Sequence, residues 1–232
     1  MGLEREDMTG TNENRPRNRR SLGAIAGLAL LAGVAVGAGA LYVGAVPAGN
    51  EATGACPLDE TARAAIDAAA RGEVAAMQVT DTPFSVAGLA FKDGEGKPTT
   101  LKAFEGRTLL VNLWATWCLP CREEMPALDA LEAAKGGPDF AVLPINIDMG
   151  EEAGPRAFYA DEKLTALTFL RDETMGVFND LKRSGVAFGL PVTLLVDEAG
   201  CVRASMNGPA NWAGPDAAAL IDAAKGAGRT GA

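Results

Sequence analysis

The 232-residue chain contains no histidine. This absence excludes Ser–His and Cys–His catalytic pairs, and it excludes zinc or copper sites built on imidazole ligands. Haem attachment of the c type is excluded too, because its C-x-x-C-H motif ends in histidine. Basic residues are also scarce, since 21 Lys and Arg stand against 30 Asp and Glu, for a net charge of −9. Such a chain lacks the cationic surface that nucleic-acid binding requires.

Charged residues are missing altogether from residues 21–50. The apolar part, residues 22–46, is about 25 residues long, and about 20 suffice for a helix to span a bilayer. Arginines crowd residues 15–20 and would keep that end in the cytoplasm. A cleaved signal peptide is the alternative, although its apolar region usually has only about 7–15 residues.

These features predict a single-pass protein of a bacterial inner membrane, with its main domain in the periplasm. We expect the chain to divide into a disordered cytoplasmic tail (1–21), a transmembrane anchor (22–46), a linker (47–55) and a periplasmic domain (56–228).

The periplasmic part alternates between helical and strand patterns. Apolar periodicity predicts helices over 58–71, 119–137, 151–163, 174–183 and 214–226. Near-continuous apolar runs predict buried strands at 108–114 and 140–148, with a shorter strand at 167–170. Turn signals predict a hairpin around 93–96, a helical turn near 101–104, and a second hairpin that joins 192–197 to 201–206. This order is typical of an α/β fold with a mixed central sheet flanked by helices.

The four cysteines stand at positions 56, 118, 121 and 201, and they can pair in three ways. In an exported domain they are oxidisable. A Cys₄ zinc site needs two close pairs, and this chain has only one, so no metal site is expected. A purely structural disulfide between Cys118 and Cys121 would gain little, because the loop it closes is so short. The spacing therefore favours a redox pair.

The pair stands where the predicted strand 108–114 passes into the helix 119–137. The thiol of Cys118 would lie at the helix N-terminus, where free N–H groups and the helix dipole stabilise a thiolate. A lowered pKa makes Cys118 the nucleophile. Pro120 suits the first helical turn, where its missing N–H has no consequence.

The sequence WCLPC at a strand–helix junction, with GLPVT (189–193) before a later strand, resembles the thioredoxin superfamily. More narrowly, LLVNLWATWCLPCREEMPAL (109–128) together with the anchor is similar to the membrane-anchored TlpA/ResA-like thiol–disulfide proteins of bacteria. The TlpA member is the most similar, because it also carries one cysteine before the domain and another in the final hairpin. The resemblance spans about 55–225 and implies a thioredoxin-like fold with an N-terminal helix and hairpin extension.

The resemblance implies roles for individual residues. Cys118 matches the attacking thiol, Cys121 the buried resolving thiol, and Pro191 the cis-proline beside the pair. Glu124 matches the acidic residue that tunes the active site; the alternative is a solvated charge near a helix start. Asn112 falls where thioredoxin has a buried aspartate, so proton transfer passes to Glu124 or to water.

Further residues are expected to support the site. Trp117 and Leu190 would form an apolar rim that receives a substrate peptide, and Trp212 is expected to be structural. By analogy with the TlpA member, Cys56 and Cys201 form a second, structural disulfide. Two unpaired buried thiols are the alternative.

The implied activity is thiol–disulfide exchange without a cofactor. Periplasmic oxidants typically carry a histidine between the two cysteines, whereas this chain has Leu119-Pro120, so a reductant is favoured over an oxidant. A periplasmic reductant requires an electron donor in the membrane, of the DsbD or CcdA kind. The implied clients are disulfide-containing copper-centre assembly proteins of cytochrome oxidase, with apocytochrome c as the alternative.

Two related activities fit the sequence poorly. A peroxiredoxin requires P-x-x-x-T-x-x-C, but Val111 and Ala115 occupy the proline and threonine positions. A metallochaperone of the Sco type uses C-x-x-x-C with a histidine, and this chain has neither.

Overall fold

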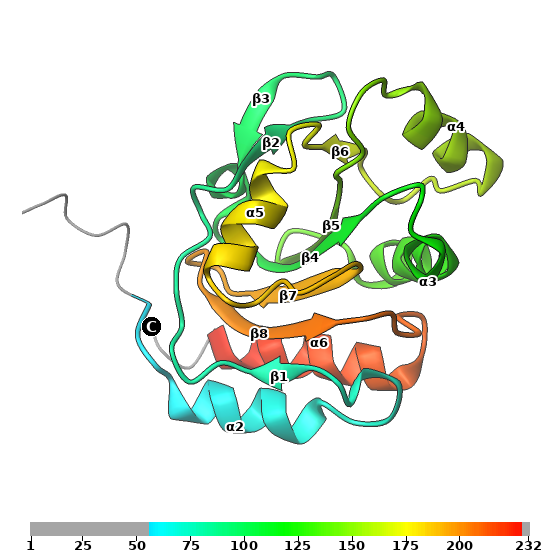
Figure 1. Cartoon of the computed structure of the whole chain (residues 1–232). Helices are drawn as coiled ribbons and strands as arrows, with labels where there is room; N and C mark the ends of the chain where they lie inside the picture. The colour runs from blue at the N-terminus through cyan, green and yellow to red at the C-terminus, as the bar shows by residue number, and fades with distance from the viewer. Residues whose placement is uncertain (1–55, 229–232) are drawn as a thin grey trace, which may run out of the picture. The chain divides into compact units, whose positions relative to one another are not determined.

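The structure, a computed structural model, describes residues 56–228 (Figure 1). The predicted tail, anchor and linker (1–21, 22–46 and 47–55) lie outside the described residues. From residue 56 to residue 228, none of the helices combines the length and the apolar character that crossing a bilayer requires.

The helices occur close to their predicted positions. They are α2 (Glu60–Ala69), α3 (Leu119–Lys135), α4 (Ala153–Asp161), α5 (Gly176–Arg183) and α6 (Pro215–Gly228), with short 3₁₀ turns η1 (Gly72–Val74) and η2 (Leu101–Phe104). Asp59 begins α2, because its carboxylate accepts hydrogen bonds from the N–H groups of Thr61 and Ala62. α3 stops just before Gly136, two residues earlier than the pattern predicts.

Eight strands form one mixed sheet in the order β1-β8-β7-β4-β5-β6-β2-β3. The strands are β1 (Gln78–Val79), β2 (Ala90–Lys92), β3 (Pro98–Thr100), β4 (Thr108–Trp114), β5 (Phe140–Asn146), β6 (Leu170–Arg171), β7 (Val192–Val196) and β8 (Val202–Asn207). The pairs β4–β5 and β5–β6 are parallel, and the others are antiparallel. The predicted mixed α/β sheet and both predicted hairpins, β2–β3 and β7–β8, are confirmed.

The outer strands differ from the prediction. β6 contains only two residues, rather than the four predicted at 167–170, and β1 has no counterpart in the prediction. β1 pairs with β8, so that Gln78 lies opposite Ser205. Strands of two residues are too short to show a period, and their pairing depends on distant segments of the chain.

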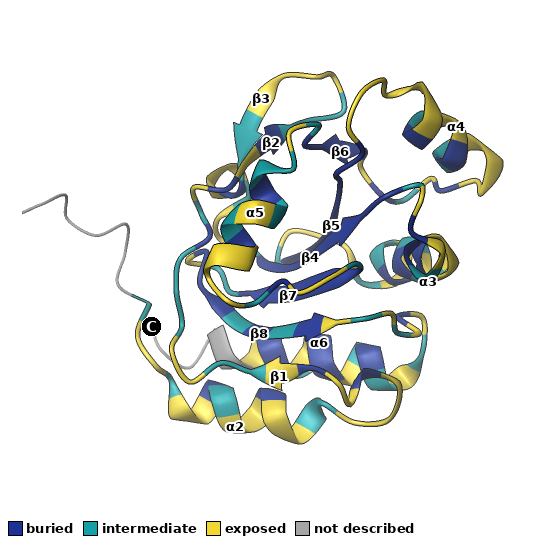
Figure 2. Cartoon of the chain, viewed as in Figure 1, coloured by how far each residue is buried: buried dark blue, intermediate teal, exposed yellow. Residues whose placement is uncertain are grey.

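The centre of the sheet is covered on both faces. Every residue of β4, β5 and β7 is buried, as Figure 2 shows in dark blue. α2 and α6 run side by side (Figure 1). An ion pair between Lys135 and Asp222, 2.6 Å long, joins α3 to α6. A sheet covered in this way leaves its strand ends and loops as the places where another molecule can reach it.

Three loops meet at one end of the central strands. Trp114, the last residue of β4, lies opposite Asn146, the last residue of β5. β7 runs the other way and begins at Val192, which lies opposite Leu113. The loops after β4, after β5 and before β7 therefore leave the sheet at the same edge. We call this the loop edge, and it comprises residues 115–118, 147–150 and 186–191.

Candidate active site

Cys118 and Cys121 form a disulfide at the loop edge, with their Cα atoms 5.3 Å apart. Cys118 is the N-cap of α3, and its Sγ accepts a hydrogen bond from the N–H of Cys121 at 3.3 Å. When the disulfide opens, N–H groups at this helix end can stabilise a thiolate on Cys118. Cys118 keeps 6% of its surface exposed, whereas Cys121 has none. Only Cys118 can therefore meet a sulfur atom of another molecule, and Pro120 lies in the first turn of α3 as predicted.

Pro191 lies on the neighbouring loop of the same edge, and the Leu190–Pro191 peptide bond is cis. The carbonyl of Pro191 accepts a hydrogen bond from the N–H of Gly208 at 2.9 Å, which ties this loop to the end of β8. Leu190 is half-buried, and Trp117 is 66% exposed. The loop edge thus brings the predicted rim residues Trp117 and Leu190 to the same end of the sheet as Cys118.

Glu124 is buried rather than solvated, with 3% of its surface exposed. One carboxylate oxygen accepts a hydrogen bond from Nδ2 of Asn112 at 2.8 Å. The other accepts hydrogen bonds from Nε1 of Trp212 at 3.0 Å and from the N–H of Ala210 at 3.1 Å. The position that could have been an ordinary surface charge is therefore an internal carboxyl group.

Burial raises the pKa of Glu124 from its usual value of 4.5 to about 7, because the interior disfavours the charged form. The three hydrogen bonds to the carboxylate act in the opposite direction and only partly compensate. A carboxyl group with a pKa near neutrality can both accept and release a proton. Glu124 also follows Cys121 by three residues on α3, which places the two side chains on the same face of the helix.

A surface cavity lies beside Glu124. It is lined by Glu123, Glu124, Ala127 and residues 209–211. Water in this cavity would give protons a path between the buried carboxyl group and the solvent. Asn112 is buried as well, and its Nδ2 donates a second hydrogen bond to Oγ1 of Thr193 at 3.0 Å.

The loop that carries Cys118 is held by Asp148, a residue that the sequence did not single out. Asp148 accepts hydrogen bonds from the N–H and the Oγ1 of Thr116, at 2.9 and 3.0 Å. A third bond comes from Nδ2 of Asn146 at 2.7 Å. Thr116 precedes Cys118 by two residues, so Asp148 fixes the backbone that leads to the reactive sulfur.

Cys56 and Cys201 form the second disulfide, with their Cα atoms 5.6 Å apart. This is the pairing that the resemblance implied. Arg203 supports the same junction, because its Nη1 donates to the carbonyl oxygen of Pro57 at 2.6 Å. The disulfide ties the beginning of the described chain to the β7–β8 hairpin.

Trp212 has a larger part in the site than its prediction as a structural residue suggests. It is fully buried and donates its indole N–H to Glu124, 88 residues earlier in the chain. Ala210 and Thr193 reach the same group of residues from other elements. No local pattern reveals such contacts, because they arise only when the loop before α6 folds against α3.

Known proteins resemble this chain over much of the described region. The family model described as Redoxin matches residues 75–221. The thioredoxin-like protein YneN of Bacillus subtilis (strain 168) is 28% identical over 117 residues, which are 49% of this chain and 64% of that protein. The thiol-disulfide oxidoreductase ResA of Geobacillus thermodenitrificans (strain NG80-2) is 29% identical over 119 residues, which are 50% of this chain and 63% of that protein. The chain thus spans slightly less than two thirds of these relatives.

A solved structure supports the fold. The thiol:disulfide interchange protein of the thioredoxin family from Chlorobium tepidum TLS superimposes with a TM-score of 0.53 at 20% sequence identity. The match covers 63% of this chain and 99% of that structure. The thioredoxin-like fold that the sequence predicts is therefore confirmed.

Proposed function

The chain belongs to the Redoxin family, and on that premise we propose that it is a thiol–disulfide oxidoreductase that works through Cys118 and Cys121. One observation carries the proposal. The two cysteines form a disulfide at the N-terminus of α3, where Cys118 keeps 6% of its surface exposed and Cys121 has none. This arrangement suits an attacking thiol and a resolving thiol.

The reaction reduces a client disulfide in two exchanges. The Cys118 thiolate attacks one client sulfur, the client S–S bond breaks, and the departing client sulfur takes up a proton. The Cys121 thiol then loses its proton and attacks the Sγ of Cys118, which releases the second client sulfur as a thiol. Two electrons pass to the client, and the Cys118–Cys121 disulfide is the product on the enzyme.

In this scheme Glu124 accepts the proton that Cys121 loses and later returns it. Its pKa of about 7 allows it to take up a proton when Cys121 attacks, and to return one when the pair is reduced again. Water in the cavity that Glu124 helps to line would connect this residue to the solvent. Asn112 cannot take this part, because its amide does not titrate.

We further propose that the protein is a periplasmic reductant anchored in the inner membrane by residues 22–46. The uncharged apolar stretch supports the anchor, and the Leu119-Pro120 spacer without histidine supports reduction rather than oxidation. A membrane donor of the DsbD or CcdA type would restore the dithiol. The proposed clients are copper-centre assembly proteins of cytochrome oxidase, and the second cysteine pair, which is of the TlpA kind, favours them. Apocytochrome c is the alternative client.

The activity is tested by the reduction of insulin disulfides with dithiothreitol as the electron source. We expect turnover by the full chain, and none by Cys118→Ser. A parallel Cu(I) titration tests the metallochaperone alternative. Tight copper binding without any reductase activity would contradict the proposal.

Clients are identified by trapping. In Cys121→Ser the second exchange cannot occur, so a client remains linked to Cys118 and can be recovered from the membrane fraction of the producing cells. The matched control is Cys118→Ser, which should trap nothing. Recovery of copper-centre assembly proteins, or of apocytochrome c, distinguishes the two client classes.

A further inference from the structure

Large apolar side chains are exposed mainly around Cys118. Of the five that are exposed within residues 56–228, two flank Cys118 directly, and two more, Met149 and Phe188, lie on the other two loops of the loop edge. The full set is Leu58, Trp117, Leu119, Met149 and Phe188. A single exposed apolar residue needs no explanation, but several on the loops at one end of the sheet indicate an interaction surface.

Met149 has 73% of its surface exposed. Met149 and Trp117 lie on adjacent loops, because each residue follows the end of its strand by three positions and the two strand ends pair. Two further contacts hold these loops together. The N–H of Ile147 donates to the carbonyl oxygen of Trp114 at 2.9 Å, and Asp148 binds Thr116.

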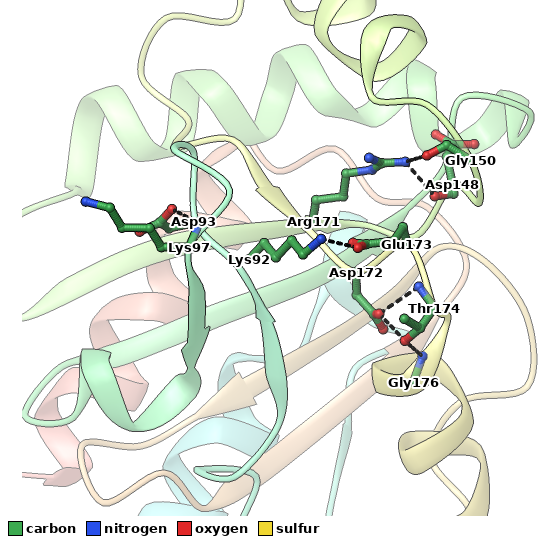
Figure 3. A network of polar contacts seen from close by, with 10 residues as sticks. All are labelled: Lys92, Asp93, Lys97, Asp148, Gly150, Arg171, Asp172, Glu173, Thr174 and Gly176. Atoms are coloured by element: carbon green, nitrogen blue, oxygen red, sulfur yellow. Dashed lines mark hydrogen bonds and ion pairs between the residues drawn. The ribbon is translucent and has the colours of Figure 1, made fainter.

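The backbone on either side of Met149 is fixed by Arg171, a buried residue of β6. Its Nη2 donates to the carbonyl oxygen of Asp148 at 3.2 Å and to that of Gly150 at 2.5 Å (Figure 3). These two residues directly precede and follow Met149. A buried guanidinium group thus holds the segment from which the exposed Met149 side chain extends.

The backbone around Phe188 is fixed in a comparable way by Asn207, at the end of β8. The Oδ1 of Asn207 accepts a hydrogen bond from the N–H of Phe188, and its Nδ2 donates to the carbonyl oxygen of Val186, both at 2.9 Å. Phe188 is 78% exposed. Both apolar side chains therefore extend from backbone segments whose positions are fixed by hydrogen bonds from polar side chains. A residue exposed by chance would not need such fixed backbone.

We propose, on the basis of the thiol–disulfide activity proposed above, that Met149 and Phe188 are specificity-determining residues for the client. They select a segment of a partner protein that carries large apolar side chains next to its disulfide-bonded cysteine. The client sulfur must reach Cys118, so the client residues next to that sulfur contact the loop edge. At the loop edge, apolar side chains of the client would pack against Met149 and Phe188, and this contact buries apolar surface of both molecules.

The charge of the chain supports a protein segment over a small anionic disulfide. The exposed residues Glu151 and Glu152 follow Met149 after one glycine, although Glu152 is paired with Arg156, and the whole chain has a net charge of −9. Oxidised glutathione carries a net negative charge and has no large apolar side chain, so it gains nothing at this surface and is repelled by it. The preferred segment has no net negative charge.

The test compares two peptides that differ only at the residues next to their single cysteine, leucines in one and serines in the other. Each cysteine carries a 2-thiopyridyl group, whose release reports the attack of Cys118. For the reduced full chain we expect kcat/KM to be about tenfold or more higher for the leucine peptide, as the burial of one large apolar side chain allows. In the double variant Met149→Ser/Phe188→Ser this preference should fall close to unity.

Two further variants complete the test. Leu58→Ser removes the exposed apolar residue that is neither next to Cys118 nor on the loop edge, and it should keep the wild-type preference. Met149→Leu/Phe188→Leu restores apolar surface and should restore the preference, which separates specificity from any loss of folding. A preference unchanged in the double serine variant would overturn the inference alone. Failure of the wild-type chain to react with either peptide would overturn the proposed function, and the inference with it.

Discussion

The side chain of Glu124 is a buried carboxyl group, and its pKa of about 7 makes the stability of the fold depend on pH. The folded chain keeps the proton on Glu124 up to about pH 7, whereas the unfolded chain loses it near its usual pKa of 4.5. Stability from this group is therefore complete below pH 4.5 and declines as the pH rises towards 7. The loss reaches about 3 kcal/mol above pH 7.

Replacing Glu124 with Gln removes this titration. We expect urea unfolding to show that the wild-type chain loses about 2.5 kcal/mol more between pH 5 and pH 8 than Glu124→Gln does. The two curves are compared at each pH, so that titrations elsewhere in the chain cancel. Equal pH dependence of the two proteins would contradict a raised pKa for Glu124.

Trp212 tunes Glu124 through its indole N–H, which favours the charged carboxylate. Trp212→Phe should raise the pKa of Glu124 further and destabilise the protein at pH 8 by about 1.5–3 kcal/mol through the lost bond, beyond the effect of the smaller ring. Carbon-13 NMR of labelled glutamate measures the pKa directly.

The chain offers a matched control for this change. Trp114 is also fully buried, but among the residues that the structure describes its Nε1 has no hydrogen-bond partner. Trp114→Phe makes the same reduction in volume and should leave the pKa of Glu124 where it was. An equal shift in both variants would mean that packing, rather than the hydrogen bond, sets the pKa.

At the level of elements, the β4–α3 loop depends on its link to the end of β5. Thr116→Val removes the hydroxyl donor to Asp148 and retains the backbone N–H bond. We expect a loss of about 1.5–3 kcal/mol in unfolding free energy, because the lost bond is made to a buried carboxylate. The rate at which iodoacetamide alkylates reduced Cys118 should fall as the loop loosens. Thr116→Ser keeps the hydroxyl and should behave like the wild type in both measurements.

Central elements were predictable because their patterns are local. The apolar runs of β4, β5 and β7 are long enough to indicate burial on both faces, and the turn residues between β7 and β8 define the hairpin. The sequence did not predict β1, and it predicted β6 as longer than it is. A strand of two residues has too short a pattern to recognise and forms only because it pairs with a partner strand. For β1 that partner lies more than a hundred positions away.

The same distinction applies to the site. The spacing of Cys118 and Cys121, and their place at a strand–helix junction, can be read from adjacent residues. The burial of Glu124 cannot, because the groups that bury it, Ala210 and Trp212, come from a distant loop. The parts played by Asp148 and Arg171 were missed for a similar reason, since they act on backbone groups of other segments.

For the molecule as a whole, the two disulfides differ in the length of chain that they close. Cys56 and Cys201 are 145 positions apart, whereas Cys118 and Cys121 are three apart. The double variant Cys56→Ser/Cys201→Ser should therefore lose about 5 kcal/mol of unfolding free energy, and Cys118→Ser/Cys121→Ser about 2 kcal/mol. Urea unfolding without reductant measures both. A larger loss in the second variant would contradict the assignment of Cys56–Cys201 as the structural pair.

The Cys56–Cys201 disulfide also determines how a mechanical load enters the domain. A pull applied to the chain ahead of Cys56 crosses the covalent bond to Cys201, which directly precedes β8. The tension then bypasses α2 and β1 and acts on the β7–β8 hairpin, whose strand β7 is paired with β4. Reduction of this one bond would redirect the same pull to α2 and the two-residue strand β1, which has few hydrogen bonds to resist it.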